Sequence, residues 1–366
     1  RARGGRRKPV IAIGALCAGI ALWAVTHPPA AVSARYLFGW SLLLFIGWSL
    51  IAVPHAAWAA DFTQARLRTT LVGSREAAML LGMCIAVAAP VLGLAYGQPE
   101  FAGPAGLALV ALAMGVPGFA ALLLVMPQPP PAGMPPAWGF GALRDLLRNG
   151  EFTRLLAAWF VNGLANGLPS VLFPIIVGAY FGLDTGALSR LMLLYFGCAV
   201  LAMPAWPLLA RRYGKARVWV AAMLVASGVF ACVLTLAPDA HLGYTAICAL
   251  TGVLLGADLV LPPALQTDVI ERDTQHSGVA RGALFFGIWS MATKAALAAA
   301  VAIGFVGLDL GGYVADTSLS RTATLTLLGL YAGLPVLLKL TAIVLVLRSG
   351  HREAAAQPTH QAADHW

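Results

Sequence analysis

The amino-acid sequence predicts an all-α membrane protein whose transmembrane helices form two similar bundles. Of its 366 residues, 60% are hydrophobic and only 11% are charged. A soluble domain has about 25% charged residues, and its surface needs polar groups that this composition does not supply. The apolar residues also occur in long runs, and one pattern of basic and acidic loops occurs twice along the chain.

Ten apolar runs are long enough to cross a membrane as helices. A transmembrane helix needs about 20 mostly apolar residues, and these runs are too long and continuous for the strands of a membrane β-barrel. Their many Gly and Ala residues allow close helix packing in lipid. The predicted spans are residues 10–26, 36–58, 74–96, 104–126, 154–179, 187–210, 217–237, 243–265, 281–306 and 325–347.

The basic residues indicate an orientation in the membrane. The formal net charge is +9, which in a soluble protein would suggest a nucleic-acid partner. If Arg1 is cytoplasmic, the segments on that side hold 19 Lys and Arg residues and the opposite segments hold three. This asymmetry follows the positive-inside rule. We therefore expect a multi-pass protein of a bacterial inner membrane with Arg1 and the C-terminus in the cytoplasm, and no nucleic-acid partner.

The chain contains an internal repeat. A Gly-basic motif opens the first span at residues 5–10 and the seventh at residues 214–218, while Asp61 follows the second span and Asp268 the eighth. The offsets are about 208 residues, and six-helix repeats of this kind build major-facilitator transporters. The second half has two spans before its basic loop and the first half has none. We therefore expect two helices, roughly 60 residues, upstream of Arg1, so that ten of twelve helices are present.

The repeat and the composition predict four segments. An N-terminal bundle that lacks its first two helices covers residues 1–126, and a cytoplasmic linker covers residues 127–153. The linker begins with a stiff proline-rich stretch and ends in a short surface helix at residues 142–153. A six-helix bundle at residues 154–347 precedes a disordered cytoplasmic tail at residues 348–366.

Two ionisable residues inside the predicted spans are candidates for function. A charged side chain costs about 2.5–3.5 kcal/mol at the centre of a span, so its presence needs a reason. Lys294 lies thirteen residues into the ninth span, and we interpret it as part of a substrate and coupling-ion network; a purely structural ion pair is the alternative. Asp258 in the eighth span is a candidate partner, or else caps a helix broken by Pro262 and Pro263.

Asn162 and Asn166 lie one turn apart on the fifth span, so they share a helix face. Gly163, Gly167 and Pro169 favour a bend there, and interrupted helices mark binding sites in transporters. The two amides are candidates for substrate binding, with interhelical hydrogen bonding as the equal alternative.

Further candidates come from the span ends and from aromatic residues. Arg75, beside Glu76 at the start of the third span, either clamps a polar substrate or marks the membrane interface. Trp289 either stacks on a substrate or packs within the bundle.

The loop charges are candidates for gating. Arg211 and Arg212 lie in the basic turn between the sixth and seventh spans, and Asp61 and Asp268 follow the second span of each repeat. We expect them to form ion pairs at the cytoplasmic face; for the arginines, a role in topology alone is the alternative.

No enzyme motif is present in the sequence. It lacks the His-Glu-x-x-His, Gly-x-Ser-x-Gly and phosphate-loop patterns. Its five cysteines lie inside apolar runs and not at metal-binding spacings. We therefore predict no enzymatic activity, no metal site and no cofactor.

Residues of the second half resemble a known transporter family. They are residues 256–271 (Gly-Ala-Asp-Leu-Val-Leu-Pro-Pro-Ala-Leu-Gln-Thr-Asp-Val-Ile-Glu), Ser277-Gly278, Arg281-Gly282, Phe286-Gly287-Ile288-Trp289 and Lys294. This block resembles the glycoside–pentoside–hexuronide:cation symporters, which are melibiose-carrier-like proteins of the major facilitator superfamily. The basic loop at residues 5–9, Arg68-Thr69 and Arg75-Glu76 are similar to loops of the same family.

The resemblance implies a twelve-helix fold and sugar uptake driven by Na⁺, H⁺ or Li⁺. It implies that Arg75 binds sugar and that Lys294 lies in the cation site, whose aspartates would precede Arg1. Melibiose carriers have an aspartate and a tryptophan where this chain has Ala52 and Ala56, so their galactoside clamp is not reproduced.

The sequence thus predicts a secondary transporter that couples a cation to a sugar or similar small polar solute by alternating access. The expected partners are this solute and the lipid bilayer. One alternative is a facilitator of a lipid-like or amphipathic solute, since the sugar clamp is lost. The other is a membrane sensor that does not transport.

Overall fold

The computed structural model describes residues 7–60, 78–79, 81–86, 88–89, 92–93, 96–98, 103–126, 140–278, 281–315, 317 and 319–348. Every regular element in these ranges is a helix, which confirms the all-α fold class. Nine of the described helices are long and apolar enough to cross a membrane, and they coincide with nine of the ten predicted spans. The remaining predicted span, residues 74–96, is described only in part.

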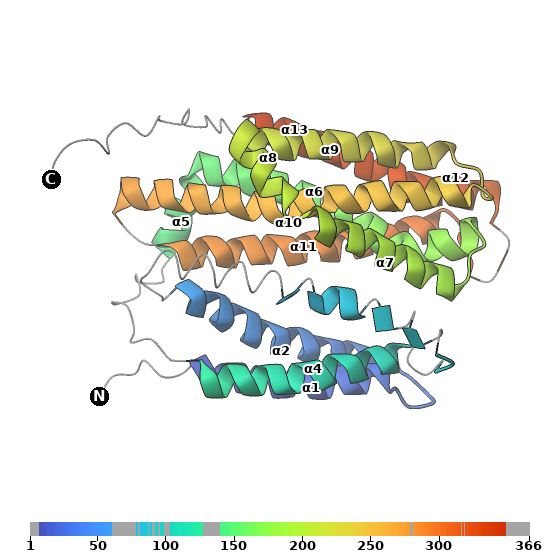
Figure 1. Cartoon of the computed structure of the whole chain (residues 1–366), viewed down its shortest axis with the longest axis horizontal. Helices are drawn as coiled ribbons and strands as arrows, with labels where there is room; N and C mark the ends of the chain where they lie inside the picture. The colour runs from blue at the N-terminus through green and yellow to red at the C-terminus, as the bar shows by residue number, and fades with distance from the viewer. Residues whose placement is uncertain are drawn as a thin grey trace. The chain divides into compact units, whose positions relative to one another are not determined.

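The chain divides into two compact units, Arg1–Pro135 and Pro136–Trp366. The described helices of the first unit are α1 (Arg7–Thr26), α2 (Ala34–Ala60) and α4 (Pro104–Val125), and α1 packs against both others (Figure 1). Glycines allow the α1–α2 contact, because a Cβ on Gly14 would lie 2.8 Å from the Leu50 Cβ and 2.9 Å from the Gly47 carbonyl oxygen. Small residues of this kind bring helix backbones close together in lipid.

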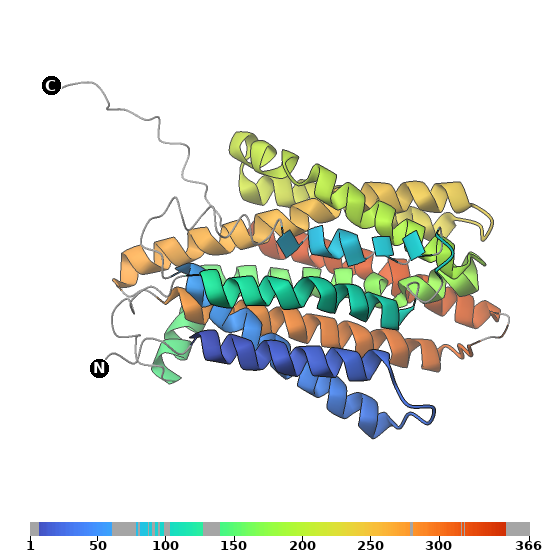
Figure 2. The same ribbon diagram turned by 60° about the horizontal axis from the view of Figure 1, so that its bottom comes forward.

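The second unit is a bundle in which α6 and α10 make most of the helix contacts. Helix α6 packs against α11 and α13, and α10 packs against α7 and α9; Figures 1 and 2 both show α10 beside α7. The elements are α5 (Phe140–Arg148), α6 (Gly150–Ile175), η2 (Ile176–Tyr180), α7 (Thr185–Ala202), α8 (Ala205–Tyr213), α9 (Lys215–Ala231), η3 (Cys232–Thr235), α10 (His241–Ser277), α11 (Gly282–Leu310), α12 (Arg321–Leu328), η4 (Gly329–Gly333) and α13 (Leu334–Arg348).

Two helices of this unit differ from the predicted spans. The span predicted at residues 187–210 is interrupted, because α7 ends at Ala202 and α8 begins after Pro204. Proline has no N–H to continue the helix ladder. The span predicted at residues 243–265 is longer than expected, because α10 continues through Pro262 and Pro263 to Ser277. The alternative in which Asp258 caps a helix broken at these prolines is therefore wrong.

The double proline in α10 has a local consequence. An amide N–H normally donates to the carbonyl four residues earlier, so the two prolines leave the carbonyls of Asp258 and Leu259 without their helix donors. The helix stays continuous because neighbouring helices pack around it, as is typical of prolines in membrane helices. The backbone hydrogen bonds of α10 are thus interrupted beside Asp258, inside the bundle.

The C-terminal end of α10 is set by Gly278, which adopts a left-handed conformation with φ of 68° and donates its N–H to the Thr274 carbonyl. A β-branched residue in this conformation should cost about 1–2 kcal/mol. We therefore expect Gly278→Val to lower the melting temperature of the purified protein. Gly282→Ala is the control, because its new Cβ would meet the Ile270 side chain at an ordinary 3.6 Å. Equal melting temperatures for the two variants would contradict this account.

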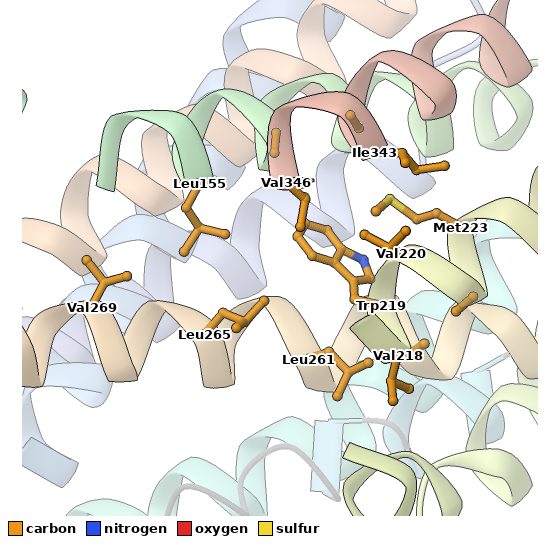
Figure 3. Close-up of a cluster of buried hydrophobic side chains, with 14 of the residues drawn as sticks. Leu155, Val218, Trp219, Val220, Met223, Leu261, Leu265, Val269, Ile343 and Val346 are labelled. Atoms are coloured by element: carbon orange, nitrogen blue, oxygen red, sulfur yellow. The ribbon is translucent and has the colours of Figure 1, made fainter. Parts of the chain in front are cut away.

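The core of the second unit forms around Trp219, which is fully buried. Figure 3 shows its ring between α13, which carries Ile343 and Val346, and α10, which carries Leu261 and Leu265. Between helices in lipid, such close contact stabilises through van der Waals packing and not through exclusion of water. This packing fixes the position of the Trp219 indole N–H.

Candidate functional site

The Asp258 carboxylate is held inside the second unit by three nitrogen donors. The Trp219 Nε1 donates to Oδ1 at 2.7 Å, and the Asn166 Nδ2 donates to Oδ2 at 2.9 Å. The Lys339 Nζ also donates to Oδ2, at 3.1 Å. Only 9% of the Asp258 side chain and 11% of the Lys339 side chain are exposed. The two residues therefore form a buried ion pair, which is the arrangement in which a charge can persist away from water.

A second amide completes the surroundings of the lysine. The Lys339 Nζ donates to the Asn162 Oδ1 at 2.9 Å, so α6, α9, α10 and α13 each contribute a polar side chain to one network. The Nδ2 of Asn162 is buried and has no hydrogen-bond partner among the described residues. We call these five residues, Asn162, Asn166, Trp219, Asp258 and Lys339, the polar network.

A cavity of about 130 Å³ adjoins the polar network within the second unit. Asp258, Lys339 and Asn166 line it at the network, and the hydroxyls of Tyr244 and Tyr331 are hydrogen-bonded to each other at 2.7 Å in its wall. The other lining residues are Ala165, Pro169, Ser170, Phe173, Met192, Tyr195, Phe196, Ala226, Ser227, Phe230, Ile247, Cys248, Thr251, Leu254, Leu255, Pro335 and Val336. The cavity therefore combines aromatic and aliphatic walls with a charged group of each sign, as ligand sites commonly do.

Three residues that the sequence singled out are thus brought together. Asn162, Asn166 and Asp258 all belong to the polar network, although Asn166 alone of the two amides lines the cavity. Helix α6 passes Pro169 without ending and widens into the π-helix η2 only from Ile176. The bend expected near the asparagines therefore does not interrupt the helix there.

Sequence reasoning missed Lys339, which is the ion-pair partner of Asp258. The signal was present, because Lys339 lies inside the predicted span at residues 325–347, and any charge within a span is a candidate by the same criterion as Lys294. Lys294 lies on α11 with an exposed side chain and is not among the cavity residues of the described chain.

Trp289 and Trp159 pack against each other inside the second unit. Their rings stack with centroids 4.8 Å apart at an interplanar angle of 17°, and the Trp159 Nε1 donates to the Thr293 hydroxyl at 2.8 Å. Trp289 is buried and does not line the described cavity. In this structure Trp289 therefore makes packing contacts, and its role as a substrate-stacking surface stays a prediction.

Ion pairs gather at the C-terminal end of α10. Asp268 pairs with Lys215 at 2.7 Å, which joins α10 to the start of α9. Asp273 pairs with Arg281 at 3.1 Å and accepts a hydrogen bond from Asn149. Arg272 pairs with Glu151 on α6, where Asn149 caps the helix. These contacts join the end of α10 to three neighbouring helices.

The predicted gating residues have different positions. Asp268 joins this group of ion pairs, whereas Arg211 and Arg212 are exposed at the end of α8. The Arg212 guanidinium lies 5.3 Å from the centre of the Tyr213 ring. The candidates Arg75 and Asp61 lie outside the described residues.

Long membrane-spanning helices around a buried ion pair define a class, the multi-pass transport proteins of membranes. Within that class, the chain belongs to the MFS/sugar transport protein family, whose model matches residues 1–349. It is therefore a secondary transporter of the major facilitator superfamily and not an enzyme. No curated protein gives a significant match.

Solved transporters share the fold. A bacterial homologue of the iron transporter ferroportin, in an outward-facing state, matches with a TM-score of 0.60 at 15% identity, over 95% of this chain and 84% of that one. A bacterial homologue of the human lysosomal transporter Spinster, in an inward-facing and unoccupied conformation, matches with a TM-score of 0.56 at 15% identity, over 94% of this chain and 81% of that one.

Proposed function

We propose that this protein is a cation-coupled symporter that carries a sugar or similar small polar solute across a bacterial inner membrane. The observation that carries the proposal is the Asp258–Lys339 ion pair beside a cavity within the second unit. Ionisable residues inside a membrane are costly, and in transporters they mark substrate and ion pathways. A pair that only stabilised the bundle would not need an adjoining cavity.

The ion pair supports coupling because its strength depends on the charge of both partners. A cation that binds to Asp258 weakens the attraction between this carboxylate and Lys339. A solute that binds Lys339 weakens the same attraction. Binding at either position therefore changes the relative stability of the conformations that alternate during transport. This is the coupling that symport by alternating access requires.

The cavity supports a solute with hydroxyl groups. Carboxylate, ammonium and amide groups at the polar network can bond to hydroxyls as acceptors or donors. Tyr195, Tyr244 and Phe230 offer aromatic surface for the less polar faces of a sugar ring. The site carries one negative and one positive charge, which suits a solute without net charge.

Uptake into proteoliposomes tests the proposal. The full chain is reconstituted and given a panel of radiolabelled mono- and disaccharides under a proton gradient, a sodium gradient, or no gradient. We expect at least one sugar to accumulate above its external concentration only with an ion gradient, and to lose accumulation when an ionophore dissipates it. Empty liposomes are the control. Equal uptake under all three conditions would contradict coupling.

An amphipathic solute is the second candidate cargo. The observation that favours it is the apolar part of the cavity wall, which includes Phe173, Phe196, Ile247 and Leu254. Acyl chains fill such surfaces, while a polar head would contact the polar network. Competition distinguishes the two cargoes: an excess of lysolipid should inhibit sugar uptake only weakly if the main proposal is right.

A further inference from the structure

The short helix α5 lies at one end of the second unit. Figures 1 and 2 both show it at the end where α10 finishes and α11 begins, and it runs across the direction of the long helices. The long helices are those that can cross a membrane, so α5 lies close to the plane of the membrane surface. Helices in this plane bind lipid when they carry an apolar face beside a basic one.

The sequence of α5 gives it these two faces. Side chains advance by about 100° for each helical residue, so residues four apart project in nearly the same direction. Leu146 is fully buried against the bundle, whereas Leu143 and Leu147 are 36% and 49% exposed. Arg144 and Arg148 form the neighbouring row and are also exposed. We call the two leucines and the two arginines the α5 surface.

Hydrogen bonds hold α5 in a fixed direction on the bundle. Asn149 joins it to α6 and donates its backbone N–H to the carbonyl oxygen of Leu146 at 3.1 Å. The Asn149 Oδ1 accepts the N–H groups of Glu151 and Phe152, at the start of α6. Its Nδ2 donates to the Asp273 Oδ1 on α10, at 3.3 Å. The α5 surface is therefore preformed, which lowers the entropic cost of binding a ligand there.

The arginines of the α5 surface have no acidic partner among the described residues. Arg144 and Arg148 take part in no ion pair and no side-chain hydrogen bond in that part of the chain. A third exposed arginine, Arg154 on α6, donates to the carbonyl oxygen of Arg348 at 3.4 Å. The acidic residue of α5, Asp145, projects away from the exposed leucines. The positive charge beside the leucines is thus available to an anionic ligand.

We propose that the α5 surface is a binding site for an anionic phospholipid of the bilayer. The guanidinium groups of Arg144 and Arg148 bind the phosphate of the headgroup, for which arginine has matching donors. Leu143 and Leu147 contact the acyl chains. An acidic protein segment would satisfy the arginines but not the exposed leucines, whereas a phospholipid satisfies both. The site is separate from the cavity, and its occupation does not depend on the transported solute.

Native mass spectrometry of the purified, delipidated full chain tests this site. The chain is incubated with equal concentrations of dioleoyl-phosphatidylglycerol, which is anionic, and dioleoyl-phosphatidylcholine, which has no net charge. We expect the wild type to prefer the anionic lipid by about fivefold or more, since each arginine near anionic lipid contributes roughly this factor. Arg144→Gln/Arg148→Gln should bind the two lipids almost equally. Arg144→Lys/Arg148→Lys should keep most of the preference, and it shows that a double variant on this helix folds.

Arg190→Gln/Arg321→Gln is the matched control, because it removes two exposed arginines from α7 and α12. Figure 1 shows α12 at the end of the second unit away from α5. This variant should keep the wild-type preference. Equal losses in the two Gln variants would overturn the proposal, and so would full preference in the α5 variant.

A headgroup without acyl chains gives the last arm of the experiment. A large excess of glycerol 3-phosphate should leave phosphatidylglycerol bound, because it offers the leucines nothing to contact. Complete displacement would show a site for soluble phosphate esters and would overturn the assignment to lipid. Leu143→Ser/Leu147→Ser should make the lipid easier to displace. None of these measurements involves transport, so their failure would leave the proposed function standing.

Discussion

Lys339→Ala should lower the free energy of unfolding by about 3–5 kcal/mol, which is the usual penalty when one partner of a buried ion pair is removed. The variant leaves the Asp258 carboxylate without a counter-charge and the Asn162 oxygen without its donor. We also expect gradient-driven uptake to be lost. Denaturant or thermal unfolding in detergent measures the first effect, and the proteoliposome assay measures the second.

Two control variants make this prediction specific. The double variant Lys339→Met/Asp258→Asn should recover most of the stability but not the uptake, because a neutral pair leaves no charge buried. Lys215→Ala removes the same type of residue from the more exposed ion pair with Asp268, whose side chains are 38% and 33% exposed, and pairs at the surface typically contribute about 1 kcal/mol or less. A Lys215 variant as unstable as the Lys339 variant would contradict the account of the buried Asp258–Lys339 pair.

Gly252→Val should separate α7 from α10 and reduce uptake at least tenfold. Gly252 and Gly256 are spaced as in a small-xxx-small packing motif. A Cβ on Gly252 would overlap the carbonyl oxygen of Tyr195, and one on Gly256 would lie 3.0 Å from the carbonyl oxygen of Ala199. Overpacking of this kind costs about 1–3 kcal/mol, or more when backbone must move. Because Tyr195 and Asp258 line the cavity from these two helices, separation of the helices would also change its shape.

The matched control is Gly197→Val on α7, where a Cβ would meet nothing within 4 Å. Both variants introduce the same β-branched residue into a helix, so intrinsic helix propensity affects them alike. We expect the Gly197 variant to keep the wild-type melting temperature within a few degrees. Similar losses of melting temperature in both variants would contradict the claim that Gly252 is needed for the close contact between α7 and α10.

The spans could be predicted from the sequence because the criterion is only the length and hydrophobicity of a continuous run of residues. About 20 apolar residues satisfy the thickness of the membrane whatever the tertiary structure, and nine described helices meet the prediction. Helix ends near prolines could not be read in the same way. Pro204 ends a helix, whereas Pro262 and Pro263 do not, because neighbouring helices decide whether the lost backbone bonds are tolerated.

The candidate site was only partly predictable for a related reason. Asp258, Asn162 and Asn166 stand out as polar residues in apolar runs, and the structure joins them. The choice between Lys294 and Lys339 as partner depends on which way each helix is rotated about its axis, and helices without a strong polar face carry little information on rotation. Trp219 could not be recognised as a polar site residue from the sequence, because the direction of its N–H is set by the packing of its ring.

The π-helical turn η4, Gly329–Gly333, precedes α13 and carries Tyr331 into the cavity wall. Each residue of an α-helix advances the direction of the side chains by about 100°. A deletion that restored regular α-helix here would therefore swing Lys339 to another side of its helix, away from its carboxylate. The ion pair therefore requires the number of residues in η4 as well as the lysine. A deletion there can separate Lys339 from Asp258 even when every polar residue is kept.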